Sequence, residues 1–263
     1  MDNLKINISI ILPTINEGKN LVNLIPDIYK TTNNIRKINF CEVIVVDDGS
    51  TDDTQDILTK LTKVHTSIKY IKRKNKASLP LSIWDGIDIS NQEYVMWLDA
   101  DGSMTTKGID AMLDELINEK SKVVIGSRFV QNGGYKGIQS NSTNFFSAIK
   151  NVYQSEDSVL AVSLSKIFNN IIRLFINCGI KDVTSGFIVG KREYFSLSQF
   201  QYASYGDYFI YLIRDLKLKN ISMVEVGYIC ETRKSGTSKS GTTFFILLKR
   251  ALPYFKAAFK VIK

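Results

Sequence analysis

The chain has 263 residues and carries 34 Lys or Arg against 26 Asp or Glu, which gives a net charge of +8. Its 44% hydrophobic content is that of a globular protein and excludes a disordered chain. No apolar run reaches the roughly 18–20 residues that span a bilayer, and the first residues do not resemble a secretory signal. Three dispersed cysteines argue against a disulfide framework and for a reducing compartment. The positive excess indicates an acidic partner: nucleic acid, a phosphorylated substrate or an anionic membrane.

In the first half of the chain, short apolar runs rich in β-branched residues alternate with stretches of helical spacing. This pattern predicts strands over residues 8–12, 42–46, 68–71, 94–98 and 122–125. It predicts helices over residues 19–29, 53–61, 81–89 and 107–117, with Asp53 or Thr54 capping the second of them. Apolar strands that alternate with helices predict an α/β fold with a mostly parallel central sheet.

The second half is less regular. We predict a long polar loop over residues 131–157, helices over 163–176 and 208–216, strands over 187–189 and 222–226, and a Gly/Ser/Lys-rich loop over 233–241. No repeat or linker divides the chain. We therefore expect one catalytic domain over residues 1–241, followed by a C-terminal helical segment over residues 242–263.

Polar clusters follow three of the predicted strands. They are Pro13-Thr14-Ile15-Asn16-Glu17, Asp47-Asp48-Gly49-Ser50 and Asp99-Ala100-Asp101. In a parallel α/β sheet, ligands bind beyond the carboxyl ends of the strands, and two nearby carboxylates suit a hard divalent cation. Each cluster alone is also compatible with a turn or a helix cap. Three of them at the edges of one sheet favour a binding site.

In order and spacing, these three motifs resemble those of family 2 glycosyltransferases, which have the GT-A fold, a Rossmann-like nucleotide-sugar-binding fold. The resemblance continues at Arg73, Lys76 and Asp85-Gly86, and it covers roughly residues 8–239. Three later segments resemble those of polyprenyl-phosphate glycosyltransferases, including dolichyl-phosphate mannosyltransferases: Gly126-Ser127-Arg128-Phe129, Asp182-Val183-Thr184-Ser185-Gly186-Phe187 and Arg233-Lys234-Ser235-Gly236-Thr237-Ser238-Lys239.

The resemblance implies a nucleotide-sugar donor, and both GDP-mannose and UDP-glucose fit it. The residues implied in donor binding are Pro13, Ile15, Glu17, Asp47, Asp48 and Ala100. A carboxylate at Asp47 or Asp48 can accept hydrogen bonds from the base or the ribose. Asp99 and Asp101 would hold Mg²⁺ or Mn²⁺ on the diphosphate, with Ser103 as a further ligand through its hydroxyl or a water.

The resemblance also implies a set of contacts to an acceptor phosphate. The implied residues are Arg128, Ser165, Asn169, Arg233 and Lys239. A guanidinium can donate two parallel hydrogen bonds to phosphate oxygens. Without the surrounding motifs, each of these Arg and Lys residues would be interpreted as a solvated surface charge. Ala161 stands where the relatives have an arginine, and Lys166 or Lys150 is the candidate substitute.

The implied reaction is the inverting transfer of a hexose to polyprenyl phosphate. A lipid phosphate is already anionic near neutrality, because its second pKa is about 6, so no strong base is required. If the acceptor is instead a hydroxyl of a glycan, a base must remove its proton, and Asp207 is the candidate. The other interpretation of Asp207 is a carboxylate at a helix N-terminus, and the Arg-containing phosphate motifs favour that interpretation.

The C-terminal segment has an amphipathic pattern. Apolar residues recur at helical spacing at Phe244, Leu248, Ala251, Phe255, Phe259 and Ile262, and lysines group on another face at Lys249, Lys256, Lys260 and Lys263. Such a helix either lies in a membrane interface or packs on the catalytic domain with a solvated lysine face. We expect a peripheral location on the cytosolic face of a membrane. Related enzymes continue into transmembrane helices, so the chain is a peripheral form, uses a membrane-anchoring partner subunit, or is truncated.

Two other classes of protein are alternatives. A basic nucleic-acid-binding protein with a Rossmann-like core is disfavoured, because the acidic strand ends would repel phosphates unless a metal intervenes. We therefore expect no nucleic-acid partner. A lipid-binding scaffold without activity is disfavoured by the intact Asp99-Ala100-Asp101 motif.

Overall fold

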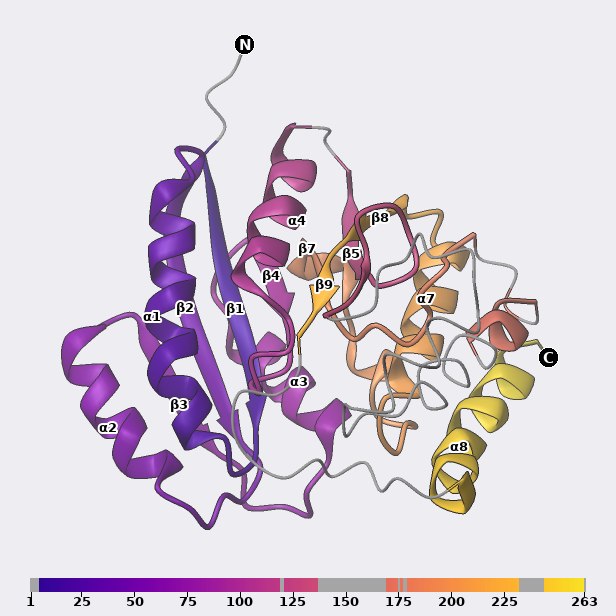
Figure 1. Cartoon of the computed structure of the whole chain (residues 1–263), viewed down its shortest axis with the longest axis horizontal. Coiled ribbons are helices and arrows are strands. Elements are labelled where there is room, and N and C mark those ends of the chain that lie inside the picture. The colour runs from indigo at the N-terminus through magenta and orange to yellow at the C-terminus, as the bar shows by residue number, and fades with distance from the viewer. Residues whose placement is uncertain are drawn as a thin grey trace.

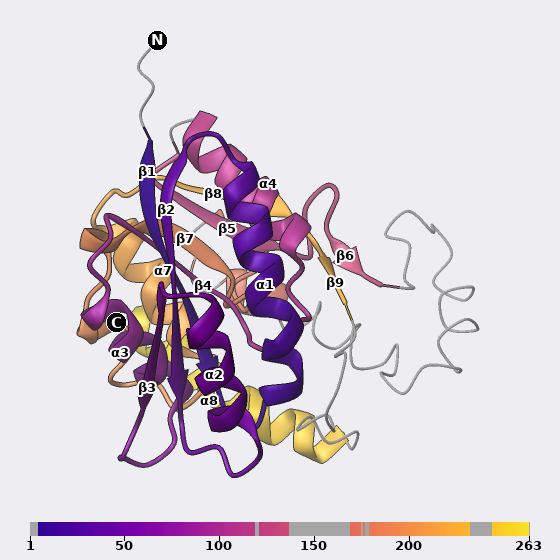
Figure 2. The same cartoon turned by 90° about the vertical axis from the view of Figure 1, so that its left-hand side faces the viewer.

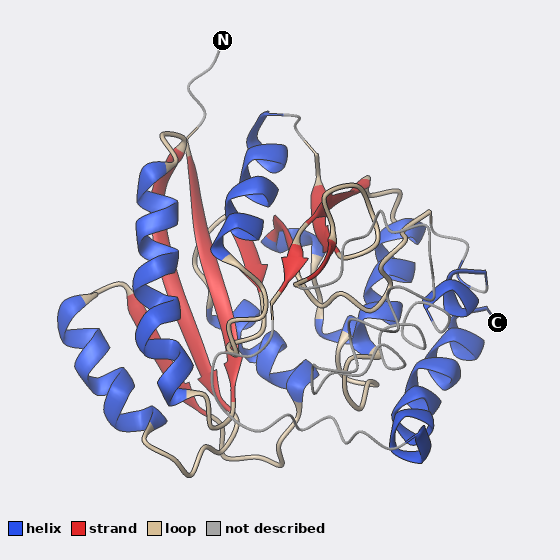
Figure 3. Ribbon diagram, in the orientation of Figure 1, coloured by secondary structure: helices blue, strands red, loops and turns tan. Residues whose placement is uncertain are grey.

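The computed structural model describes residues 5–118, 121–136, 169–174, 176, 179–231 and 244–262. Its centre is a seven-stranded sheet with helices on both faces (Figures 1 and 3). The strands are β1 (Ile6–Thr14), β2 (Ile38–Asp47), β3 (Ile68–Lys72), β4 (Tyr94–Trp97), β5 (Val123–Ser127), β7 (Ile188–Lys191) and β8 (Met223–Gly227).

The strand order is β3-β2-β1-β4-β7-β5-β8, and all neighbours are parallel except β7, which runs antiparallel to both β4 and β5. The prediction of a mostly parallel α/β sheet is therefore confirmed. The direction of β7 could not be predicted, because the long connection before it carries no signal of where the chain re-enters the sheet.

The helices lie close to their predicted positions. They are α1 (Gly18–Asn34), α2 (Thr54–Val64), α3 (Leu79–Ile89), α4 (Thr106–Asn118), α7 (Tyr208–Leu218) and α8 (Phe244–Ile262), with short 3-10 helices at Arg192–Tyr194 and Leu197–Gln199. The turn into α2 is fixed by Asp52, whose Oδ1 accepts hydrogen bonds from the Thr54 backbone N–H (3.1 Å) and hydroxyl (2.5 Å). Asp53 occupies the N-cap position without a capping side-chain bond.

Two buried clusters form the core, one on each face of the sheet. Alternate residues of a strand point to opposite faces, so Ile10 of β1 packs under α1 and α4, whereas Ile11 packs under α3 and α7. Val45 and Val46 divide in the same way on β2. Figure 2 shows the resulting layers, with α1 and α4 on one side of the sheet and α3 and α7 on the other.

A second, two-stranded sheet pairs β6 (Gly134–Tyr135) with β9 (Ile229–Cys230). Sequence analysis predicted loop for this part of residues 131–157, because two-residue strands leave no periodicity to detect. Residues 137–157 of that loop and residues 163–168 lie outside the described residues. Residues 169–174 are helical, as predicted.

Helix α8 packs against α7 (Figure 1). Ala257 and Ala258 are buried in the core, with Tyr254 and Val261 packed beside them. Phe259 is 60% exposed. Within the part of the chain that is described, no helix is long and apolar enough to cross a membrane.

Candidate functional site

The three predicted clusters lie side by side at one edge of the sheet. Of the three strands that these clusters follow, β1 is the middle one, and β2 and β4 flank it in parallel. Thr14 is in register with Asp47, and Ile11 is in register with Trp97, two residues before Asp99. Neighbouring parallel strands end at the same edge, so the fold gathers the candidate donor-binding residues at that edge.

Asn16 joins the loop after β1 to the loop after β2. Its backbone N–H donates to the Ser50 hydroxyl (2.8 Å), and its side-chain oxygen accepts from the Thr51 N–H (2.7 Å). Asn16 has a φ of 57°, a left-handed conformation that asparagine adopts more readily than most residues. Sequence analysis did not assign Asn16, although a polar residue between Ile15 and Glu17 marks a turn.

Asp47 shapes the turn that follows β2. Its Oδ1 accepts from the backbone N–H groups of Gly49 (3.1 Å) and Ser50 (2.7 Å), and its Oδ2 accepts from the Tyr70 hydroxyl (2.9 Å). Burial, together with the hydrogen bond to Asp47, raises the pKa of Tyr70, so the phenol remains a donor at neutral pH. These three hydrogen bonds hold the Asp47 carboxylate in one orientation, in which it would meet a nucleotide.

Asp48 belongs to an internal ion-pair cluster. Its carboxylate accepts from the Arg73 guanidinium and from the Ser78 N–H at the start of α3, and Arg73 Nε also donates to Asp85 Oδ2 (2.6 Å). Burial acts to lower the pKa of Arg73, but Asp85 and Asp48 raise it overall, so the guanidinium stays charged. Arg73 thereby ties the end of β2 to α3.

The loop after β4 carries the candidate metal ligands. Asp101 is buried, and its Oδ1 accepts from the Ser103 N–H (2.9 Å) across Gly102, whose φ is +77°. The Glu231 N–H donates to the Ser103 carbonyl (2.9 Å), so the chain just after β9 braces this loop. Sequence analysis missed this brace, because Glu231 lies 128 residues beyond Ser103.

The donor set suits a hard divalent cation. The Asp-Ala-Asp motif offers carboxylate oxygens, which Mg²⁺ and Mn²⁺ prefer. Among the described residues, no group of three or more His, Cys, Asp or Glu is placed to hold a metal ion. The two carboxylates would therefore share the cation with diphosphate oxygens and water, the usual arrangement for magnesium at a phosphate substrate.

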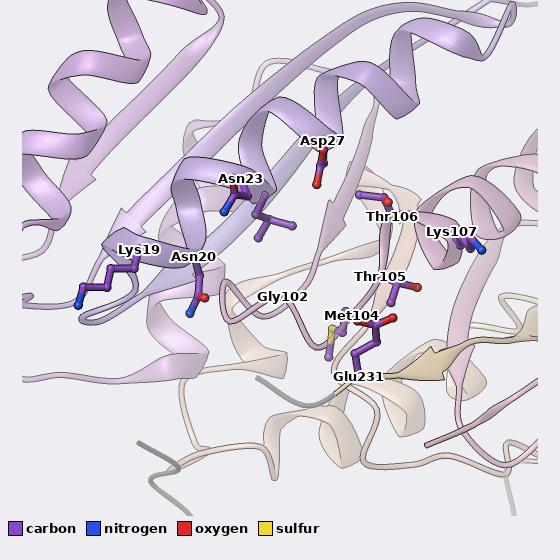
Figure 4. Close-up of a pocket in the computed structure, with 11 residues that line it drawn as sticks. Lys19, Asn20, Asn23, Asp27, Gly102, Met104, Thr105, Thr106, Lys107 and Glu231 are labelled. Carbon is purple, nitrogen blue, oxygen red and sulfur yellow. The ribbon is translucent and has the colours of Figure 1, made fainter. Parts of the chain in front are cut away.

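A cavity of about 310 Å³ lies between α1 and the loop that leads into α4 (Figure 4). Most of the residues that line it are polar, among them Asn20, Asn23 and Asp27 of α1, Thr105 of the loop, and Glu231. The volume is at the lower end of the range for small-molecule pockets. Gly102 and Met104 of the loop after β4 line the cavity, whereas the candidate metal ligands Asp99 and Asp101 do not.

Arg128 forms a bidentate pair with Asp182. Its Nε donates to Oδ2 (2.8 Å) and its Nη2 to Oδ1 (2.7 Å), and Nη2 also donates to the Thr184 hydroxyl (3.1 Å). The Phe129 and Tyr135 rings flank the guanidinium, with centroids 5.4 and 5.7 Å from Cζ. Asp182 thus occupies one edge of the fork that sequence analysis assigned to an acceptor phosphate.

Asn169 joins the same cluster. Its side-chain oxygen accepts from the Val183 N–H (3.0 Å), and its amide donates to the Lys181 carbonyl. Asn169 therefore orders the segment that carries Asp182 and Thr184. Of the predicted acceptor-phosphate residues, the fold brings Arg128 and Asn169 together, whereas Ser165, Arg233 and Lys239 lie outside the described residues.

Asp207 is buried immediately before α7. Its Oδ1 accepts from the backbone N–H groups of Ser204 (3.0 Å) and Tyr205 (2.7 Å). The next residue, Tyr208, accepts a hydrogen bond from Trp97 Nε1 (3.0 Å), which ties α7 to the strand that precedes Asp99. The carboxylate therefore stabilises a turn close to the candidate metal loop.

The doubly covered, mostly parallel sheet with an acidic motif after β4 agrees with the GT-A fold, which the solved structures reported below share. The sequence model described as glycosyl transferase family 2 matches residues 9–197, well over half of the chain. The chain belongs to glycosyl transferase family 2.

Two curated relatives are similar over most of this chain. A dolichol-phosphate mannosyltransferase of Pyrococcus furiosus is 27% identical over 243 residues, which cover 92% of this chain and 62% of that protein. A polyprenol monophosphomannose synthase of Mycolicibacterium smegmatis is 25% identical over 188 residues, covering 70% of this chain and 61% of that protein. The match thus spans less than two thirds of the length of either relative.

Solved structures of glucosyl-3-phosphoglycerate synthase from Mycobacterium tuberculosis share the fold. The complex with Mn²⁺ and UDP-glucose has a TM-score of 0.63 at 15% identity and covers 98% of this chain and 79% of that one. The complex with Mg²⁺ and UDP has a TM-score of 0.62 at 14% identity, with the same coverage. At this identity, the likeness is one of fold.

Proposed function

We propose that this family 2 enzyme transfers a hexose, mannose or glucose, from a nucleotide sugar to a polyprenyl phosphate, with inversion and with Mg²⁺ or Mn²⁺. One observation supports the proposed nucleotide-sugar donor. The Asp99–Asp101 loop lies at the same edge of the sheet as the loops after β1 and β2, which are hydrogen-bonded to each other. The proposed polyprenyl phosphate acceptor is supported by the two relatives that match most of the chain, a dolichol-phosphate mannosyltransferase and a polyprenol monophosphomannose synthase.

In this proposal, the loops after β1 and β2 hold the nucleoside, and Asp99 and Asp101 hold the cation. A cation held by these two residues would supply charge neutralisation for the departing nucleoside diphosphate. A lipid phosphate oxygen attacks the anomeric carbon from the opposite face. The new carbon–oxygen bond forms as the bond to the diphosphate breaks, and that bond's electron pair leaves with the nucleoside diphosphate. The protein contributes mainly position and electrostatics.

No general base is needed for a lipid phosphate, because it is already ionised. This agrees with the geometry of Asp207, whose carboxylate accepts backbone hydrogen bonds from Ser204 and Tyr205. The second candidate is transfer to a hydroxyl with Asp207 as base. The location of Asp207 favours this candidate. Asp207 directly precedes Tyr208 at the start of α7, and Tyr208 is hydrogen-bonded to Trp97 at the end of β4.

A donor-by-acceptor assay tests the acceptor. With Mn²⁺ and GDP-mannose or UDP-glucose, we expect nucleoside diphosphate release to rise at least about tenfold when a short polyprenyl phosphate is added. The free polyprenol, which lacks the phosphate, is the matched control and should give no rise. Asp207→Asn should keep most of the transfer, because the acceptor needs no base. Loss of transfer in Asp207→Asn with intact nucleotide binding would instead support the hydroxyl acceptor.

We also propose that α8 holds the enzyme peripherally on an anionic membrane. Residues 232–263 contain eight Lys or Arg and no Asp or Glu, and the rest of the chain contains 26 of each, so the whole excess of +8 lies in this segment. Leu252 (51% exposed) and Phe259 (60% exposed) are seven residues apart and share one side of α8, with exposed Lys256 between them. Apolar and basic side chains on one helix face suit a lipid interface.

Vesicle flotation tests this location. The enzyme should float with vesicles of phosphatidylcholine containing phosphatidylglycerol, less so as salt is raised, and not with phosphatidylcholine alone. The double variant Leu252→Ser/Phe259→Ser should bind about tenfold more weakly, since two apolar side chains no longer enter the interface. Val64→Ser, which alters an exposed residue of α2, is the control. Equal binding to both vesicle types would contradict the proposal.

A further inference from the structure

Helix α8 is anchored on α7 and on the loop before it. Ala257 and Ala258 are fully buried there. Lys260 Nζ lies 4.5 Å from the centroid of the Tyr202 ring and 5.8 Å from that of Tyr211. This packing fixes the position of Tyr254, which lies one turn earlier in the helix.

The Tyr254 hydroxyl lies directly against Gly206. A Cβ atom added at Gly206 would come within 2.0 Å of the Tyr254 hydroxyl oxygen and 3.1 Å of its Cζ. Only a glycine fits between this phenol and the turn. Asp207, the next residue, holds the same turn through the N–H groups of Ser204 and Tyr205. The turn is thus fixed by a carboxylate of its own and by a side chain from α8.

This turn belongs to the surroundings of the metal loop. Tyr208 follows it and is hydrogen-bonded to Trp97 at the end of β4. Burial raises the pKa of Tyr254, the neighbouring Tyr205 and Asp207 raise it further, and Arg128 and Asp99 also act on it, with opposite signs. The Tyr254 phenol therefore stays protonated and lies within the electrostatic reach of both Asp99 and Arg128.

We propose that Tyr254 is a positioning residue of the transferase site: its contact with Gly206 sets the place of the Asp207 turn relative to the Asp99–Asp101 loop. The proposal rests on the transferase function proposed above. It makes α8 a part of the active site. Since an error of about 1 Å in the placement of reacting groups costs up to about 100-fold in rate, a shift of this turn should appear in turnover.

A double-mutant cycle tests the contact. Gly206→Ala should lower kcat by about 10- to 100-fold, because its methyl group collides with the Tyr254 hydroxyl. The KM for the nucleotide sugar should change less than about twofold, since the donor loops are untouched. Tyr254→Phe should cost about threefold in kcat. The double variant Gly206→Ala/Tyr254→Phe should recover at least about fivefold over Gly206→Ala, because the clashing oxygen is gone.

Tyr211→Phe, which removes a hydroxyl from the neighbouring helix, is the matched control and should leave kcat unchanged. The same loss from Gly206→Ala in both backgrounds would overturn the proposal. So would a fall in melting temperature with no change in kcat of the folded enzyme. If the wild type transfers nothing to lipid phosphate, the proposed acceptor fails, and the cycle is then measured on hydrolysis of the nucleotide sugar.

Discussion

Replacing Asp99 or Asp101 by asparagine is expected to lower transfer by about a thousandfold or more, the largest effect predicted for this enzyme. Each change removes one negative charge from the acidic pair that follows β4. A cation held by one carboxylate neutralises the leaving diphosphate less well, and such charge stabilisation is commonly the largest contribution to rate. The loop itself should persist, because asparagine at position 101 can still accept from the Ser103 N–H.

Single-turnover rates across a Mn²⁺ titration measure this effect, with EDTA-treated enzyme as the zero point. We expect a weaker apparent affinity for Mn²⁺ in both variants and an unchanged melting temperature. Asp110→Asn is the control, since it removes one charge from an exposed position of nearby α4. Wild-type turnover in both active-site variants would rule out a metal role for this motif.

The second large effect is on stability. Arg128→Ala should lower the free energy of unfolding by about 3–5 kcal/mol, because it leaves a buried carboxylate without its cation. Asp182 is completely buried and receives three hydrogen bonds from Arg128, one of them from the backbone N–H. Adding Asp182→Asn should restore more than about 1 kcal/mol, since a neutral amide costs less to bury than an unpaired charge.

Urea denaturation of Arg128→Ala, of the double variant Arg128→Ala/Asp182→Asn and of a control variant measures these differences. Arg36→Ala, at an exposed position of the loop after α1, should change stability by less than about 0.5 kcal/mol. The experiment also separates two roles of Arg128. If Arg128→Ala keeps wild-type stability but loses transfer to lipid phosphate, the guanidinium acts on the acceptor and not on the fold.

The sequence alone was enough to locate most of the sheet and the polar clusters that follow its strands. Ile8–Leu12 and Glu42–Val46 are apolar runs of the length of a strand, and each is followed by acidic or turn-forming residues. Such signals are local, because a strand and the loop after it are adjacent in the chain. The predictions for β1, β2 and β4 therefore needed no knowledge of their neighbours.

Contacts between residues that are far apart in the chain could not be predicted. The sequence could not show that Asp48 pairs with Arg73, or that Asp182 pairs with Arg128 from 54 positions away. Nor did the helical pattern of α8 reveal which side would pack. Ala257 and Ala258 are buried while Phe259 stays exposed, because close approach to α7 favours small side chains over the more hydrophobic phenylalanine.

The sequence by itself determined the family, the α/β alternation and which polar residues follow the strands, since motif order and short-range periodicity depend on neighbours along the chain. The tertiary structure decided which groups engage these carboxylates inside the protein: Tyr70 for Asp47, Arg73 for Asp48, and the Ser103 N–H for Asp101. It also decided that α8 reaches the Asp207 turn through Tyr254. Ion pairs and steric contacts depend on distances in space, and those distances are fixed only when the sheet and its covering helices have packed.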